Sequence, residues 1–214
     1  MILERSDRIA VAPLRKSCTG VILAGGRSSR FGGAPKGLAR IGGERIIDRV
    51  ARALRASTDA LLLAANDPAA EGWVPGALRV ADRTPGLGAL GGLQAAMAHA
   101  GTPLLVVAWD MPFVSASLLR ELRARGERGA LGVVPEGPDG RPEPLCAWYS
   151  NALLPRIERL LAAGERRAMA LADGYGIERI AQAAVAEHGD PALIFDNVNT
   201  VDDLRRAEAR LRDE

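Results

Sequence analysis

Short hydrophobic runs alternate along the chain with segments in which hydrophobic residues recur every three or four positions. The first pattern predicts buried strands, and the second predicts amphipathic helices. Because strands alternate with helices, we expect right-handed crossovers and an α/β fold: a three-layer, mostly parallel, Rossmann-like sheet with helices on both faces. The predicted strands are 19–24, 60–65, 77–81, 103–109, 130–135 and 144–149, and the predicted helices are 44–55, 89–100, 115–125, 152–163 and 201–212.

The length and composition are those of one such domain. The chain has 214 residues, of which 48% are hydrophobic but only 4% aromatic. Aliphatic side chains must therefore fill the core, as is usual where helices cover a parallel sheet. We expect a single domain over 18–214, and a loose extension over 1–17, where acidic and basic residues are scattered.

Charge and cysteine content exclude several classes of protein. The 28 basic and 26 acidic residues give a net charge of +2, which predicts no broad basic surface for nucleic acid or membrane lipid. The N-terminal stretch lacks the apolar run of a signal peptide or membrane span. Cys18 and Cys146 form no zinc-binding pattern, and we interpret both as reduced core residues of a cytoplasmic protein.

A glycine-rich stretch follows the first predicted strand, where sheets of this kind bind ligands. Glycines allow the backbone N–H groups to converge on phosphate oxygens, and the basic residues between them add positive charge. The stretch is not a Walker A loop, because Lys36 stands between Pro35 and Gly37. The alternative is a flexible surface loop. The residues concerned are Gly25, Gly26, Gly32 and Gly33, with Arg27, Arg30 and Lys36.

Polar residues also follow the later strands. Asp110 comes directly after the buried run that ends at Trp109, and a carboxylate there can bind Mg²⁺ while phosphate oxygens complete its shell. Asn66 and Asp82 follow the second and third predicted strands, so they should lie at the same edge of the sheet. The alternatives are a helix cap for Asp110 and ordinary turn residues for the other two.

A second glycine motif offers a different function. Gly86–Gly91 reads as G-x-G-x-x-G, and Asp110 lies near the spacing of a ribose-binding acid, as in a dinucleotide-binding module. Against this alternative, the motif follows a short strand, the first strand already carries a richer loop, and Pro112 follows Asp110 closely.

Several segments together carry a family resemblance. The glycine-rich stretch starts with Leu23-Ala-Gly-Gly and continues to Arg30, Gly32 and Lys36. The other matching segments are Trp109-Asp-Met-Pro112, Gly88 to Leu93, Gly164-Glu-Arg-Arg167 and Asn197-Val-Asn-Thr200. In these segments the chain resembles the MobA-like nucleotidyltransferases, and in the Leu-Ala-Gly-Gly form it is similar to the molybdenum cofactor guanylyltransferases. The departures from the family pattern are Pro35, Ala89, Gly91 and Trp109.

The resemblance implies a magnesium-dependent transfer of GMP from GTP to the phosphate of molybdopterin or its molybdenum form, with release of pyrophosphate. Cytidylyl or sugar-phosphate transfer is the nearer alternative. The resemblance also allows transient contact with other proteins of cofactor synthesis or target-enzyme maturation. The resemblance also implies roles for single residues: Asp110 is the metal ligand, and Arg30, Lys36 and Asp110 are the catalytic residues. The residues that it implies as contacts to the nucleotide are Leu23, Ala24, Gly25, Gly26, Lys36, Asn66, Asp82 and Asp110. Those that it implies as contacts to the acceptor are Gly88, Gly92, Arg167, Asn197 and Asn199.

Overall fold

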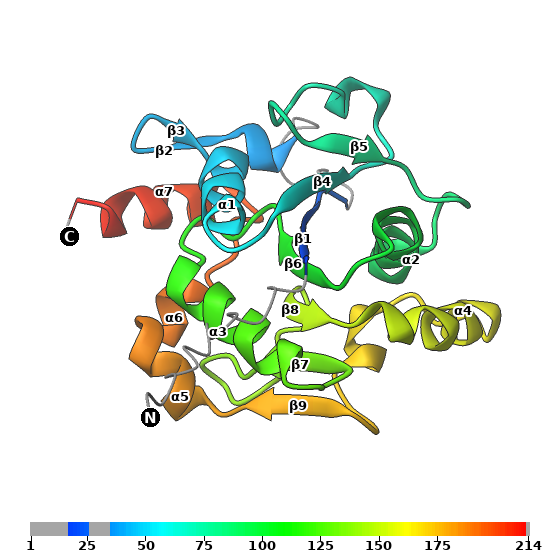
Figure 1. Cartoon of the computed structure of the whole chain (residues 1–214). Helices are drawn as coiled ribbons and strands as arrows, with labels where there is room; N and C mark the ends of the chain where they lie inside the picture. The colour runs from blue at the N-terminus through cyan, green and yellow to red at the C-terminus, as the bar shows by residue number, and fades with distance from the viewer. Residues whose placement is uncertain (1–16, 26–34, 213–214) are drawn as a thin grey trace, which may run out of the picture.

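A seven-stranded sheet forms the centre of the fold (Figure 1). The structure is a computed structural model that describes residues 17–25 and 35–212. Residues 1–16 of the expected N-terminal extension therefore lie outside the described residues, as do the loop residues Gly26, Arg27, Arg30, Gly32 and Gly33. In spatial order the strands are β5 (Leu78–Val80), β4 (Ala60–Ala64), β1 (Thr19–Leu23), β6 (Leu104–Ala108), β8 (Cys146–Tyr149), β7 (Gly132–Pro135) and β9 (Ile177–Ile180).

The sheet is parallel except at one strand. β1 runs parallel to β4 and β6, whereas β8 is antiparallel to both of its neighbours, β6 and β7. All five residues of β1 are buried, which explains its continuous apolar sequence: helices cover both faces. In the register of these strands Leu23 lies opposite both Ala64 and Ala108. The carboxyl ends of β1, β4 and β6 are therefore level, and the residues after them share one edge.

Helices cover the two faces in pairs, which confirms the predicted three-layer fold. α1 (Ile46–Arg55) and α3 (Ala116–Glu127) lie on one face, and α2 (Gly88–Ala100) and α4 (Leu154–Ala162) lie on the other (Figure 1). The first pair packs through side chains such as Val50 and Leu122, the second through Leu93 and Ile157. The apolar spacing predicted these four helices, and Ser115 caps α3 as expected.

The predicted helix 44–55 was wrong at its start. Glu44 and Arg45 form β3 (Glu44–Arg45), which pairs with β2 (Arg40–Ile41) in a short hairpin, and α1 begins at Ile46. Gly42 and Gly43 both have positive φ, as a two-residue hairpin turn requires. The turn thus overrides the helical preference of the two residues that follow it.

The last third of the chain contains elements that the pattern did not predict. These are β9, α5 (Gln182–Val185) and α6 (Pro191–Ile194), all of four residues and therefore too short for a periodic signal. α7 (Val201–Arg210) was predicted, and it packs on the β2–β3 hairpin around buried Ile41, Val198 and Ala207. Figure 1 shows α7 beside this hairpin, so this late helix packs next to the segment that follows the glycine loop. In the described ranges, each helix is too short or too polar to cross a membrane.

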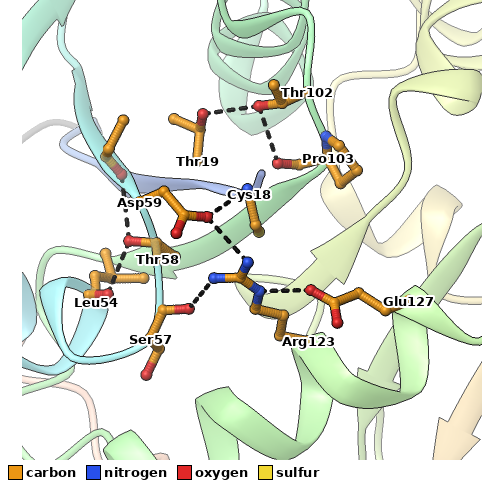
Figure 2. Close-up of polar contacts among 11 residues, drawn as sticks. Cys18, Thr19, Leu54, Ser57, Thr58, Asp59, Thr102, Pro103, Arg123 and Glu127 are labelled. Atoms are coloured by element: carbon orange, nitrogen blue, oxygen red, sulfur yellow. Dashed lines mark hydrogen bonds and ion pairs between the residues drawn. The ribbon is translucent and has the colours of Figure 1, made fainter. Parts of the chain in front are cut away.

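A buried arginine connects three segments at the amino-terminal edge of the sheet (Figure 2). The side chain of Arg123 is 7% exposed, and its guanidinium pairs with Asp59 at 2.9 Å and Glu127 at 2.7 Å and donates to the Ser57 carbonyl at 3.0 Å. Asp59 also accepts from the Cys18 N–H at 2.9 Å. The cluster therefore joins α3 to the residues that enter β1 and β4. Burial raises the pKa of the Cys18 thiol to about 11, so this cysteine stays protonated at neutral pH.

We expect Arg123→Met to destabilise the fold by about 2 kcal/mol, because Asp59, Glu127 and the Ser57 carbonyl all lose a charged partner. The measurement is urea unfolding at constant m value. Arg120→Met is the matched control, since Arg120 is exposed on the same helix and its loss should change the free energy of unfolding by less than about 0.5 kcal/mol. Equal effects of the two substitutions would contradict the structural role of the cluster.

Candidate functional site

A cavity of about 500 Å³ lies at the carboxyl ends of β1, β4 and β6. It contains most of the predicted site residues. The residues that line it are Leu23, Ala24, Gly25, Lys36, Ala64, Ala65, Asn66, Asp82, Gly86, Gly88, Ala89, Gly92, Ala108, Trp109, Asp110 and Leu145. The level ends of the three strands explain why residues so distant in sequence meet here.

Lys36 and Asp110 form an ion pair in this cavity. The Lys36 ammonium donates to Asp110 Oδ2, and the two side chains are only 15% and 10% exposed. The ammonium also donates to Asn199 Oδ1 at 2.6 Å. Lys36 therefore lies between a carboxylate and an amide oxygen from two other segments. Partial burial strengthens the ion pair with Asp110 relative to water.

Close packing fixes the short 3₁₀ turn Lys36–Leu38 that carries this lysine. A Cβ atom on Gly37 would lie 2.5 Å from the ring of Trp109, so only glycine allows the turn to rest on the indole. The indole of Trp109 in turn stacks on Trp73, with ring centroids 5.7 Å apart and planes 6° apart. The large residue at 109, a departure from the family pattern, is thus accommodated by Gly37 on one side and Trp73 on another.

Asn66 and Asp82 form a reciprocal pair across the ends of β4 and β5. The Asn66 amide donates to Asp82 Oδ2 at 2.8 Å, and the Asp82 N–H donates to Asn66 Oδ1 at 2.8 Å. A Cβ added to Gly92 would meet Leu23 at 3.1 Å, which shows how closely α2 approaches this pair and β1. The pair presents fixed carboxylate and amide groups to the cavity.

The G-x-G-x-x-G segment belongs to the wall of this same cavity. It follows the edge strand β5, and Gly91 lies within α2. Gly88 has a φ of +63°, and a Cβ there would lie 2.7 Å from the Arg166 carbonyl oxygen, so glycine allows the 164–167 segment to pack against the start of α2. The glycines therefore permit close packing beside Asp82. They do not form the loop after the central first strand that a dinucleotide-binding fold uses.

Three residues that we predicted as acceptor contacts occupy different surroundings. Arg167 is 81% exposed and pairs with Glu165 at 3.1 Å, and the hydrogen bonds from Arg167 lower the pKa of Glu165 to about 2. The Asn197 amide donates to the Phe195 carbonyl at 3.0 Å. Neither residue lines the cavity. Asn199, by contrast, lies directly at Lys36, which we assigned to the nucleotide.

Some lining residues were absent from the sequence predictions. Ala64, Ala65 and Ala108 carry no chemical signal, because alanine at a strand end is equally common in a core. Leu145 reaches the cavity because β8 is antiparallel to its neighbours, so the start of β8 lies at the carboxyl end of β6. There the Ala108 N–H donates to the Leu145 carbonyl at 2.8 Å. A parallel strand would have taken this residue to the opposite edge.

The site fits a divalent cation that is bound partly by the protein and partly by phosphate oxygens of a substrate. Within 17–25 and 35–212, no group of three or more His, Cys, Asp or Glu side chains could hold a metal. Mg²⁺ commonly uses one or two carboxylates and takes its other ligands from phosphates and water. Asp110, with one carboxylate at the cavity edge, fits this mode of binding and not a closed protein cage.

Glu143 lies two residues before Leu145, in the turn that enters β8. Burial, together with the charge of Asp139, raises the pKa of this carboxyl from 4.5 to about 7. A Cβ on Gly137 would lie 2.7 Å from the Glu143 carboxylate, so the turn closes tightly over the side chain. The pKa of this carboxyl therefore lies near neutral pH, two residues before the cavity residue Leu145.

Comparison with known proteins gives a consistent result. The sequence model of the MobA-like NTP transferase domain matches residues 20–189. The chain is 33% identical over 196 residues to the molybdenum cofactor guanylyltransferase of Desulfosudis oleivorans, covering 91% of this chain and 96% of that protein. It is 37% identical over 193 residues to a protein of Deinococcus radiodurans named probable molybdenum cofactor guanylyltransferase, covering 90% and 94%.

A solved structure agrees with the sequence relatives. The molybdopterin-guanine dinucleotide biosynthesis protein A of Archaeoglobus fulgidus superposes with a TM-score of 0.78 at 26% identity, covering 92% of this chain and all of that chain. The match extends over nearly the whole chain, so it includes the strands and segments that form the cavity.

We expect the stability of the protein to fall as pH rises from about 4.5 to about 7, through the titration of Glu143. The raised pKa means that the folded state holds the proton more tightly than the unfolded state, so unfolding becomes easier as pH passes through this window. Glu143→Gln should remove this contribution. The difference in melting temperature between variant and wild type should therefore grow in favour of the variant up to pH 7 and stay constant above it.

Glu158→Gln is the control for this titration, because Glu158 is exposed on α4. Its difference from wild type should stay flat over the same pH range. A flat difference for Glu143→Gln as well would contradict the raised pKa.

Proposed function

Since the chain belongs to the MobA-like NTP transferase family and is a nucleotidyltransferase, we propose that it transfers GMP from GTP to the phosphate of molybdopterin or its molybdenum form. Pyrophosphate is the second product. The observation that carries this proposal is the meeting of Lys36 and Asp110 in the cavity at the carboxyl edge of the sheet. This arrangement supplies a cation for the triphosphate and a carboxylate for a metal in one place.

The cavity suits a nucleotide in size and chemistry. Its volume of about 500 Å³ lies within the range of about 300–1,000 Å³ usual for small-molecule sites. Guanine has N–H donors on its N1 and N2 edge, and the carboxylate of Asp82, held by Asn66, is an acceptor for such donors. A site that hydrogen-bonds a base in this way rejects bases that lack the matching groups. This argument favours GTP over CTP, because cytosine presents only its N4 amino group where guanine presents two adjacent donors.

Divalent metal is the expected cofactor of such a transferase, and we propose Mg²⁺ at Asp110. A bound cation would neutralise charge on the phosphates during transfer. Lys36 contributes a second positive charge, which can hold the triphosphate and stabilise the pyrophosphate as it leaves. Arg30, outside the described residues, keeps its expected role in the same task.

The reaction asks the protein for position and charge, and not for a covalent intermediate. An oxygen of the acceptor phosphate attacks the α-phosphorus of GTP, the bond to the β-phosphate oxygen breaks, and pyrophosphate leaves with the electron pair. The glycine-lined wall, with Gly88 and Gly92, allows the two substrates to approach closely. Holding them in line accounts for much of the acceleration in reactions of this kind.

We expect GTP with Mg²⁺ to raise the melting temperature, and CTP, ATP and UTP to raise it much less. At about 100 times the dissociation constant the stabilisation should be about 2.7 kcal/mol. The measurement is a thermal shift series at equal ligand concentrations. Equal shifts with CTP and GTP would contradict the assignment of guanine as the base.

Asp110→Asn should abolish metal-dependent turnover while the protein still folds. Asparagine keeps the volume and most hydrogen bonding of the side chain but removes the charge that a hard cation prefers. If Asp110 only capped a turn, the change would cost a few tenths of a kcal/mol, since Asn and Asp cap about equally well. Pyrophosphate release is measured across a magnesium titration, with Asp67→Asn as the control at an exposed cap. Near wild-type turnover with an unshifted magnesium optimum would remove Asp110 from the site.

A further inference from the structure

The start of α7 is connected to Lys36 through Asn199. The Asn199 side chain accepts from the Lys36 ammonium at 2.6 Å, although Asn199 itself is an exposed residue. An exposed asparagine has several rotamers, and holding one of them costs conformational entropy. Something must therefore fix the backbone from which this side chain extends.

Two hydrogen-bonded anchors fix that backbone, one on each side of Asn199. On one side the Val198 N–H donates to the Asp110 carbonyl at 2.9 Å, which ties the segment to the end of β6. On the other side the carboxylate of Asp203 accepts from the Asn199 N–H at 2.9 Å and from the Thr200 N–H at 2.7 Å, both at Oδ2. Asp203 is 16% exposed, and its other oxygen pairs with Arg206.

The Asp203 carboxylate does more than a helix cap requires. In a capping box, the side chain at this position accepts from the cap residue alone, here Thr200, while Thr200 accepts from the Asp203 N–H in return. The additional bond from Asn199 lies outside the helix and outside that motif. Burial opposes the charged form, but hydrogen bonds from Asn199 and Thr200 outweigh it and lower the pKa of Asp203, so the carboxylate is ionised at neutral pH.

We propose that Asp203 is a positioning residue for the transfer reaction: it orients Asn199 so that the amide oxygen holds the Lys36 ammonium at the triphosphate site. The inference rests on the proposed role of Lys36. α7 then has two tasks, because it also covers the β2–β3 hairpin. Loss of the Asp203 carboxylate should release Asn199, and Lys36 should lose its contact with the Asn199 amide oxygen.

The matched control is Asp202, the neighbouring acid in the same first turn. Both residues place one negative charge near the helix N-terminus, but Asp202 is 76% exposed and pairs with Arg205. Asp203→Ala should lower kcat about 10-fold, as is usual when a group that orients an active-site residue is lost. Asp202→Ala should leave kcat unchanged. Asp203→Glu should retain most activity, because glutamate is the common partner in a capping box.

A double-mutant cycle separates positioning from stability. If Asp203 acts through Asn199, Asp203→Ala should have no further effect on kcat in an Asn199→Ala background. The same loss of kcat in both backgrounds would overturn the proposal. So would a loss equal to that of Asp202→Ala, because both would then reflect only the helix terminus.

A second readout does not depend on turnover. The chain has two lysines, Lys16 and Lys36, so acylation of each can be followed by mass spectrometry with Lys16 as the internal reference. Asp203→Ala and Asn199→Ala should both speed the acylation of Lys36 about fivefold, the equivalent of one lost hydrogen bond. Asp202→Ala should not change it. An unchanged rate in Asp203→Ala overturns the proposal, whereas faster labelling in a protein that releases no pyrophosphate from GTP would refute only the proposed function.

Discussion

The ion pair between Lys36 and Asp110 is the interaction on which the arrangement of the site depends. It joins the turn after the glycine loop to the end of β6, across 74 positions of sequence. The pair is mostly buried, so each charge needs an oppositely charged partner. A phosphate can replace the carboxylate as the partner of Lys36, and a metal ion can replace the ammonium as the partner of Asp110. A polyphosphate with a divalent cation supplies both replacements at once. The pair thus balances the two buried charges against each other.

Small residues allow the surrounding segments to come close enough for this pair to form. Gly37 rests on the indole of Trp109, and Gly88 lets the 164–167 segment meet the start of α2. In both places a single methyl group would collide with its neighbour. The glycines of this chain therefore serve packing at the site as well as backbone freedom, and the bulky Trp109 is possible because Gly37 leaves room for it.

The two edges of the sheet have different tasks. At the amino-terminal edge, Arg123 and Asp59 form an ion pair, and Asp59 also accepts from the Cys18 N–H (Figure 2). This cluster stabilises the fold. At the carboxyl edge, Asn66, Asp82, Lys36 and Asp110 present polar atoms to a cavity. The segment just before α7 connects this helix to the second edge, because the Val198 N–H donates to the Asp110 carbonyl and Asn199 accepts from Lys36. A late segment of the sequence thereby takes part in a site that begins after the first strand.

The sequence by itself determined the layers and most of the cavity. Burial on both faces requires continuous apolar runs, and parallel strands place the next residues at one edge, so Gly25, Asn66, Asp82 and Asp110 were predicted together. Their roles toward GTP and Mg²⁺ remain predictions. The tertiary structure decided the rest. The antiparallel β8 brought Leu145 to the cavity, the Gly42–Gly43 turn replaced the start of a helix, and the segment before α7 brought Asn199 to Lys36, whereas Arg167 stayed on the surface. Each of these depends on contacts between distant segments, which local periodicity does not encode.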